Sequence, residues 1–250
     1  MTPSTMLPLA IGLVALLYAS VGHAGATGYI AVMTLLGLEP AVIRPTALVL
    51  NVIVATIASA QFFRAGHFRS GLFWPLAVAS VPCAAAGGAI SLPTESFEML
   101  VGGVLLASAL RIVRDAWRDR GAAAEEPEAA PRKPIAPAWL AMLGGGIGLL
   151  SGLTGVGGGV FLTPALLALD AAPVKRVAAV SAPFILVNSL AGLAGGLVAG
   201  RAIPAVSLPV VAAAVIGGAV GSQLGAFRLP VQTVRLLMAA VLAVAAIKLL

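Results

Sequence analysis

Five glycines lie within eight positions, from Gly152 to Gly159, in the apolar stretch SGLTGVGGGVFLTPALLAL. Glycine inside a helix costs about 1 kcal/mol relative to alanine, so this density indicates that the backbone leaves the helix here. A helix that restarts after such a break presents free N–H groups and the positive end of its dipole. Both favour a small anion, without any basic side chain. The stretch therefore predicts an anion site made by backbone amides.

A second stretch of this kind, SVGHAGATGYIAV, begins at Ser20, and its His23 is the only ionisable side chain at either break. Two interpretations of His23 stay open: a neutral hydrogen-bonding histidine, or a proton carrier or direct anion ligand. Asn51 and Asn188 either line the same cavity or join helices through hydrogen bonds. The candidate substrate-binding residues are Gly22, His23, Gly25, Thr27, Gly28, Asn51, Thr154, Gly155, Gly157, Gly158, Gly159, Ser181 and Asn188.

The composition identifies the environment in which these stretches fold. The chain has 250 residues, of which 60% are hydrophobic and only 10% charged, whereas a soluble domain carries about 25% charged residues. Apolar runs long enough to cross a bilayer recur from end to end, so we predict an integral membrane protein. The mid-span pairs in GGAISL and GGAVGSQ are predicted to allow close helix packing.

Several classes of function are excluded. The basic residues lie in short connections between apolar runs, a pattern that reports membrane topology rather than nucleic-acid binding. The lone Cys83 cannot form an intramolecular disulfide or a cysteine-based metal cluster. No paired intramembrane carboxylates, His-Glu-x-x-His or Gly-x-Ser-x-Gly motif occurs, so we expect neither an enzyme nor a metal or organic cofactor.

The chain divides into two similar halves. A polar stretch from Arg111 to Trp139 separates SVGHAGATGYIAVMTLLGLEP from its counterpart SGLTGVGGGVFLTPALLALDA, and each half then has an apolar span that carries an asparagine. We predict a first transmembrane repeat over residues 1–113, a cytoplasmic linker over 114–137 and a second transmembrane repeat over 138–250.

The distribution of charge predicts the direction of these repeats. If each glycine-rich region dips into the membrane and returns, three crossings follow it in each half and the halves are inverted. Of the 15 Lys and Arg residues, only Arg44, Arg201 and Lys248 then lie outside, in better agreement with the positive-inside rule than straight spans give. The predicted fold is an all-α polytopic membrane protein with two pseudo-symmetric, inverted repeats. Each repeat opens with a glycine-broken or re-entrant helix followed by three transmembrane helices.

The twin glycine motifs and the stretch GLLSGLTGVGGGVFLTPALL resemble the TauE/SafE sulfite exporter family over nearly the whole chain outside residues 111–137. The resemblance implies a bacterial inner-membrane protein that moves sulfite, sulfonates or other small organosulfur anions. It also implies that Gly155, Gly157, Gly158 and Gly159 form part of the anion site. The first half departs from the family pattern at His23, Ala24 and Ala26, so the identity of the anion stays open.

The resulting hypothesis is a secondary transporter, and specifically an exporter, of a small sulfur-containing anion such as sulfite or an organosulfonate. Two glycine-rich breaks near the midplane bind the anion, and the repeats expose it alternately to each side. Proton coupling is an open alternative for which His23 is the candidate carrier, and a passive anion channel is the competing function. The expected partners are a small inorganic or organosulfur anion and the lipid bilayer, with protons added if transport is proton-coupled. The sequence predicts no oligomeric state.

Overall fold

The computed structural model describes residues 3–90, 135–230, 233 and 236, and every regular element in them is a helix. The helices of the N-terminal half are α1 (Pro3–Ser20), α2 (Ala26–Leu35), α3 (Pro40–Arg64) and α4 (Ser70–Ala89). Those of the C-terminal half are α6 (Pro137–Thr154), α7 (Gly159–Ala168), α8 (Val174–Val198) and α9 (Leu208–Gln223), which continues as the π-helix η2 (Leu224–Arg228). The predicted all-α class is confirmed.

Five of the described helices are long and apolar enough to cross a membrane. They correspond to α3, α4, α6, α8 and α9 with η2. Two shorter apolar helical segments, Met6–Ser20 of α1 and Gly159–Ala168, which is α7, flank the breaks. The prediction of a polytopic membrane protein is confirmed. The third crossing predicted after each broken helix falls on residues 91–113 and 231–250, nearly all of which lie outside the described part.

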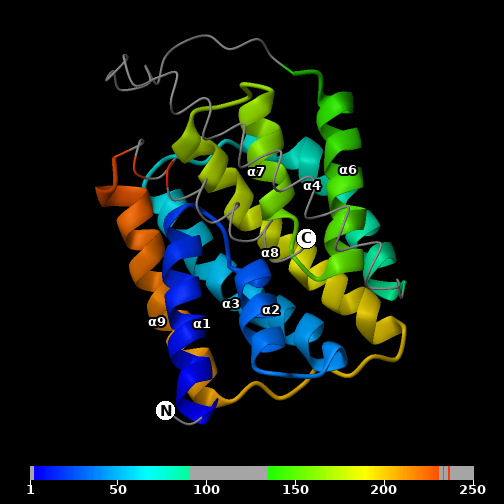
Figure 1. Ribbon diagram of the computed structural model, residues 1–250. Helices are drawn as coiled ribbons and strands as arrows, with labels where there is room; N and C mark the ends of the chain where they lie inside the picture. The colour runs from blue at the N-terminus through cyan, green and yellow to red at the C-terminus, as the bar shows by residue number, and fades with distance from the viewer. Residues whose placement is uncertain (1–2, 91–134, 231–232, 234–235, 237–250) are drawn as a thin grey trace.

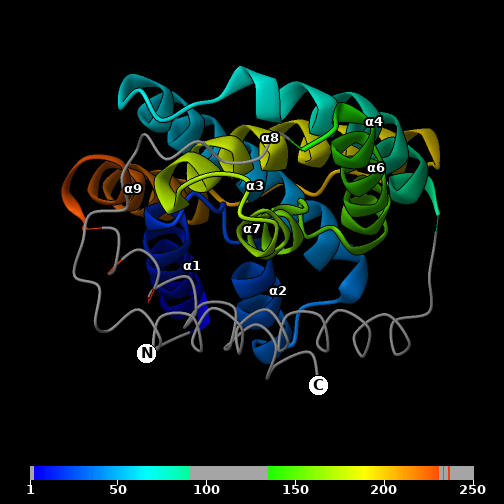
Figure 2. The same ribbon diagram turned by 90° about the horizontal axis from the view of Figure 1, so that it is seen from above.

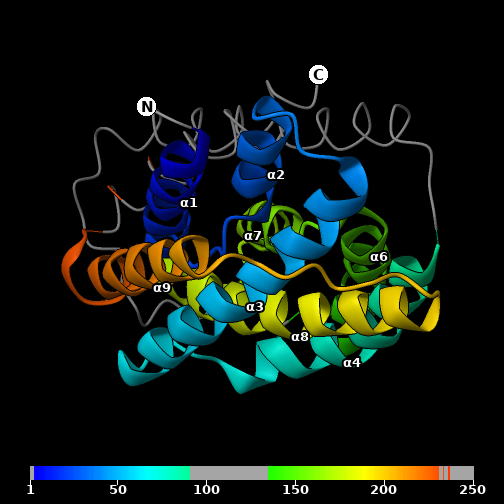
Figure 3. The same ribbon diagram turned by 90° about the horizontal axis from the view of Figure 1, so that it is seen from below.

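The two halves have the same order of elements, and their helices pack in matching pairs. The last described helix of each half packs against the first helix of the other half, because α4 contacts α6 and α9 contacts α1. Helices α3 and α8 cross at the centre, and Figures 2 and 3 show the α1–α9 pair on one side of them and the α4–α6 pair on the other. Exchanging the halves therefore maps one set of contacts onto the other.

Glycines allow these pairs to pack closely. A Cβ atom on Gly144, Gly148 or Gly152 of α6 would overlap backbone atoms of α4 at Leu76, Ser80 and Ala84. In the other pair, Gly217 and Gly221 of α9 meet the backbone of α1 at Gly12 and Leu16 in the same way. In α4, a Cβ on Gly87 would overlap the α6 backbone at Leu149, and one on Gly88 would overlap the α8 backbone at Gly192. The packing role predicted for GGAISL and GGAVGSQ is confirmed.

Both glycine-rich regions form helical hairpins. In Figure 1, α1 rises from the N terminus and α2 runs back down, whereas α6 runs down and α7 returns upward. Each region thus returns toward the end of the molecule from which it started, and the two hairpins enter from opposite ends. Which of these ends faces the cytoplasm stays a prediction. The domain limits also stay predictions, since the linker 114–137 lies outside the described residues except for 135–137.

Candidate functional site

The helices break at both glycine stretches, as the sequence predicts. Helix α1 ends at Ser20 and α2 begins at Ala26; between them Gly22 has φ 76° and Gly25 has φ 104°. Helix α6 ends at Thr154 and α7 begins at Gly159; between them Gly155, Gly157 and Gly158 have φ of 74°, 80° and 80°. Residues with a Cβ adopt these left-handed conformations at a cost, so glycine is needed at the turns.

Each hairpin ends in a helix whose first turn has no side-chain cap. The N-cap residues are Gly25 for α2 and Gly158 for α7, and no side chain accepts a hydrogen bond at either cap. The first N–H groups of an α-helix have no partner within the helix, and they carry the positive end of its dipole. Both breaks therefore present donors in a buried position, because residues 21–25 and 155–158 are all buried.

His23 joins the two breaks. Its Nε2 lies 3.0 Å from the carbonyl oxygen of Gly159, the first residue of α7, and its Nδ1 lies 3.3 Å from the carbonyl oxygen of Val21. The imidazole is only 1% exposed. Because both ring nitrogens face acceptors, a neutral imidazole satisfies one of them and an imidazolium satisfies both.

Asn51 of α3 is the second link between the halves. Its Nδ2 donates to the carbonyl oxygen of Val156 in the second break, at 3.3 Å, and to Ser189 Oγ of α8, at 3.4 Å. A Cβ on Gly157 would lie 2.5 Å from the same Nδ2. Asn51 is fully buried, and its Oδ1 has no hydrogen-bond partner among the described residues. This amide therefore fixes the position of the second break.

Asn188 and Ser181 hold helices together. Asn188 Oδ1 accepts a hydrogen bond from Ser80 Oγ of α4, and its Nδ2 donates to the carbonyl oxygen of Phe184 at 2.8 Å. Ser181 of α8 shares a hydrogen bond of 2.9 Å with Thr163 of α7. These contacts agree with the helix-joining alternative for Asn188, and Ser181 secures the helix that follows the second break.

The remaining predicted residues support the breaks from within. Thr154 Oγ1 accepts a hydrogen bond from the Val156 N–H at 3.0 Å, and Thr27 shares one of 2.8 Å with the hydroxyl of Tyr18. Gly28 lies in the first turn of α2, where a Cβ would lie 2.5 Å from Val14 Cγ1 of α1, so this glycine allows α1 and α2 to pack closely.

Two buried hydroxyls that the sequence analysis missed lie beside the helix restarts. Tyr29 OH and Ser151 Oγ have no hydrogen-bond partner among the described residues. A Cβ on Gly25 would lie 3.0 Å from Tyr29 OH, and one on Gly158 would lie 3.3 Å from Ser151 Cβ. Nothing in the local sequence indicates that the Tyr29 hydroxyl lies beside a helix restart. Ser151, in contrast, directly precedes the glycine motif, and its position could have indicated this.

Comparison with known proteins finds one matching family and a relative of nearly the same length. The model of the family described as "Sulfite exporter TauE/SafE" matches residues 7–249. The chain is 35% identical over 249 residues to a protein of Sinorhizobium fredii named "Probable membrane transporter protein y4hK", covering 100% of this chain and 99% of the relative. No solved structure matches the chain.

Proposed function

Because the chain belongs to the sulfite exporter TauE/SafE family and is thus a membrane transporter rather than an enzyme, we propose that it exports a small sulfur-containing anion from bacteria. The proposed substrate is sulfite or an organosulfonate, carried across the inner membrane by alternating access. The proposed site is the space between the restarts of α2 and α7.

One observation carries this proposal: a residue of the first break contacts the start of α7 inside the protein, and both helices that follow the breaks start at an N-cap glycine. The N-caps are glycines with positive φ, and the His23–Gly159 contact of 3.0 Å brings the two breaks together. Converging N–H groups bind an anion through charge-assisted hydrogen bonds, with no buried cation to desolvate. Tyr29 OH and Ser151 Oγ supply two further donors that have no partner among the described residues.

Burial of the breaks supports alternating access over a channel. All break residues are buried, which supports a site that would be closed to both sides of the membrane in this arrangement. The matching packing of the halves gives two interfaces, α1–α9 and α4–α6, of the same construction. Rocking one repeat against the other would open the site to one side at a time, as is usual for transporters built from repeats.

The two acceptors of His23 support the proposal of proton coupling. A neutral His23 donates to one of the carbonyl oxygens of Val21 and Gly159, and a protonated one donates to both. Protonation would strengthen the link between the breaks and add a positive charge beside the anion site. The proton and the anion would then favour the same conformation, which is the requirement for coupling.

Anion uptake into liposomes that contain the purified protein tests the proposed function. The anions are sulfite, sulfate, thiosulfate, sulfoacetate and chloride, each with and without a pH gradient. We expect saturable uptake of one sulfur anion that accelerates with the gradient. Fast, unsaturated flux of several anions, indifferent to pH, would instead establish a passive channel and refute alternating access.

His23→Gln separates coupling from binding, because glutamine keeps a hydrogen-bonding amide and does not titrate. We expect the variant to bind the anion nearly as well as the wild type and to lose the pH dependence of transport. The matched control is His67→Gln, since His67 is the only other histidine and lies between α3 and α4 rather than in either break. If His23→Gln keeps the wild-type pH dependence, His23 is not the carrier.

A further inference from the structure

The oxygen of the Asn51 side chain is a buried hydrogen-bond acceptor at the second break. Asn51 is fully buried, and its Oδ1 has no partner among the described residues, whereas its Nδ2 donates to Val156 O and Ser189 Oγ. The reversed amide orientation is unfavourable, because it would set Oδ1 against the carbonyl oxygen of Val156, and neither atom can donate. A buried acceptor without a donor is costly, so this oxygen indicates that the anion-bound state supplies a donor.

The Asn51 amide lies against the backbone of the second break. A Cβ on Gly157 would lie 2.5 Å from Asn51 Nδ2, so this close approach requires glycine. The covalent geometry of the amide holds Oδ1 roughly 2.2 Å from Nδ2. The next residue, Gly158, is the N-cap of α7, and the N–H groups that follow it are the proposed anion donors. An atom that only accepts therefore lies beside a row of donors.

The two breaks offer little positive charge to an anion. His23 is the only ionisable side chain within residues 20–28 and 151–159, and residues 21–25 and 155–158 are all buried. The cost of burying an ion grows with the square of its charge, so a dianion costs about four times as much as a monoanion. Each helix N-terminus supplies the equivalent of about half a positive charge. Two of them therefore match a monoanion better than a dianion.

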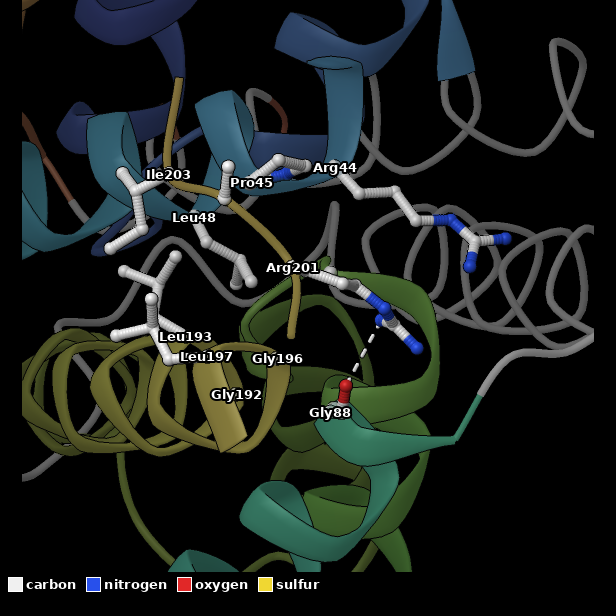
Figure 4. Close-up of a pocket in the computed structure, with 13 residues that line it drawn as sticks. Arg44, Pro45, Leu48, Gly88, Gly192, Leu193, Gly196, Leu197, Arg201 and Ile203 are labelled. Carbon is white, nitrogen blue, oxygen red and sulfur yellow. Dashed lines mark hydrogen bonds between the residues drawn. The ribbon is translucent and has the colours of Figure 1, made fainter. Parts of the chain in front are cut away.

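The basic side chain of Arg44 is directed away from the Asn51 amide. It begins next to the second break, since a Cβ on Gly155 would lie 3.4 Å from Arg44 Cβ. Figure 4 shows this side chain extending away from Leu48, one turn further along α3, at a cavity of about 40 Å³ that Arg201 also lines. Asn51 lies seven residues after Arg44, about 10 Å along the helix axis.

We propose that the protein transports its anion in a protonated form, and that Asn51 Oδ1 accepts the hydrogen bond of that proton. For sulfite this form is hydrogensulfite, a monoanion whose O–H donates to Asn51 while its other oxygens accept from the N–H groups of the helix restarts. Sulfate, thiosulfate and alkanesulfonates carry no such proton near neutral pH, so Asn51 selects against them. This substrate class rests on the proposed function and narrows it to oxyanions that also carry a hydrogen-bond donor.

Sulfamate and methanesulfonate test the acceptor, because they are monoanions of nearly equal size and only sulfamate has N–H donors. The measurement is the concentration of each anion that raises the midpoint of thermal unfolding of the purified protein by the same amount. We expect sulfamate to act at an about fivefold lower concentration, the effect of one net hydrogen bond. Equal concentrations for the wild-type protein would overturn the proposal.

Asn51→Leu should abolish this preference, because leucine has a similar shape and no acceptor. The matched control is Gln61→Leu, since Gln61 is also an amide on α3 whose Oε1 is buried without a partner among the described residues. Its Nε2 donates to Ala219 O of α9 at 3.1 Å, about 15 Å along the helix from Asn51. The control should keep the preference. A preference that survives Asn51→Leu, or that is lost equally in Gln61→Leu, would refute the role of Asn51; the wild-type comparison decides the proposal even if Asn51→Leu does not fold.

The pH dependence of sulfite binding gives an independent test. Among the described residues, the titratable groups at the breaks are His23, Tyr18 and Tyr29, with Arg44 beside Gly155. Tyrosine and arginine keep their protons near neutral pH. An effect of His23 acts on sulfite and sulfamate alike, and sulfamate itself stays a monoanion from about pH 5 to 8, where histidine titrates.

We therefore expect the sulfite concentration, relative to the sulfamate concentration that gives the same midpoint, to rise with pH. The rise should approach about tenfold per pH unit as hydrogensulfite loses its proton. A constant or falling ratio would overturn the protonated substrate. Because sulfite itself titrates, the comparison of His23→Gln with the wild type is made with sulfamate.

Failure of the proposed function gives a different result. If liposomes take up no sulfur anion and none shifts the midpoint, the proposed function fails and the protonated substrate fails with it. If sulfite is taken up while sulfamate and methanesulfonate act at equal concentrations, only the protonated substrate fails.

Discussion

The conformation of Gly157 is the most sensitive test of the second break. An alanine there must adopt φ 80°, which costs about 1–2 kcal/mol for a residue with a Cβ. The new Cβ would also lie 2.5 Å from Asn51 Nδ2 and 2.9 Å from Ser189 Oγ. Overpacking of a buried site costs about 1–3 kcal/mol more. We therefore expect Gly157→Ala to lower the free energy of unfolding by about 2–5 kcal/mol.

Two other glycines separate the backbone contribution from the packing contribution. Gly200 has φ 77° but open space around a Cβ, so Gly200→Ala should show the backbone cost alone, about 1–2 kcal/mol. Gly146 lies within helix α6 and also has open space, so Gly146→Ala should be neutral or stabilise by up to about 1 kcal/mol.

The assay is the midpoint of thermal unfolding of the purified proteins in one detergent. At about 3 °C per kcal/mol for a chain of this size, Gly157→Ala should lower the midpoint by about 6–15 °C. Sulfite uptake by the folded variant should also fall, because the displaced Asn51 amide no longer holds the second break. A Gly157→Ala protein as stable as Gly200→Ala would refute the contact between this glycine and Asn51.

Two further predictions concern helix packing and the anion. Gly152→Ala should greatly reduce the yield of folded protein, because the new Cβ would overlap the α4 backbone at Ala84. The control Gly145→Ala, whose Cβ would lie 3.6 Å from its nearest neighbour, Cys83 Sγ, should give the wild-type yield. Equal yields of the two variants would contradict the packing of α4 on α6. Tyr29→Phe should change the free energy of unfolding by less than about 1 kcal/mol, since the hydroxyl has no hydrogen-bond partner in the described part of the chain. The same substitution should raise the half-saturating sulfite concentration several-fold. Unchanged uptake by Tyr29→Phe would remove this hydroxyl from the site.

The local glycine content was sufficient to predict where the helices break and where helices pack closely. Glycine acts through its own backbone, so the density from Gly152 to Gly159 marked the second break without knowledge of its neighbours. The same reasoning placed the first break, which lies between the end of α1 at Ser20 and the start of α2 at Ala26.

The contacts of the two asparagines could not be predicted from the local sequence. Asn51 and Asn188 occupy similar spans, yet Asn188 lies about one turn further along its helix, counted from the starts of α3 and α8. Asn51 therefore reaches the second break, and Asn188 meets Ser80 of α4 instead. A shift of three residues decides which helix an amide contacts, and sequence similarity this low does not determine such a shift.

The sequence by itself determined the membrane environment, the all-helical class and the places where the backbone leaves the helix, because hydropathy and glycine content act over a few residues. Only the tertiary structure decided which atoms meet. His23 reaches Gly159 across 136 positions, and Arg44 and Arg201 come to one cavity from different halves. The physical reason is that hydrogen bonds and charge pairs act over a few ångströms, so their partners depend on how helices distant in sequence pack together.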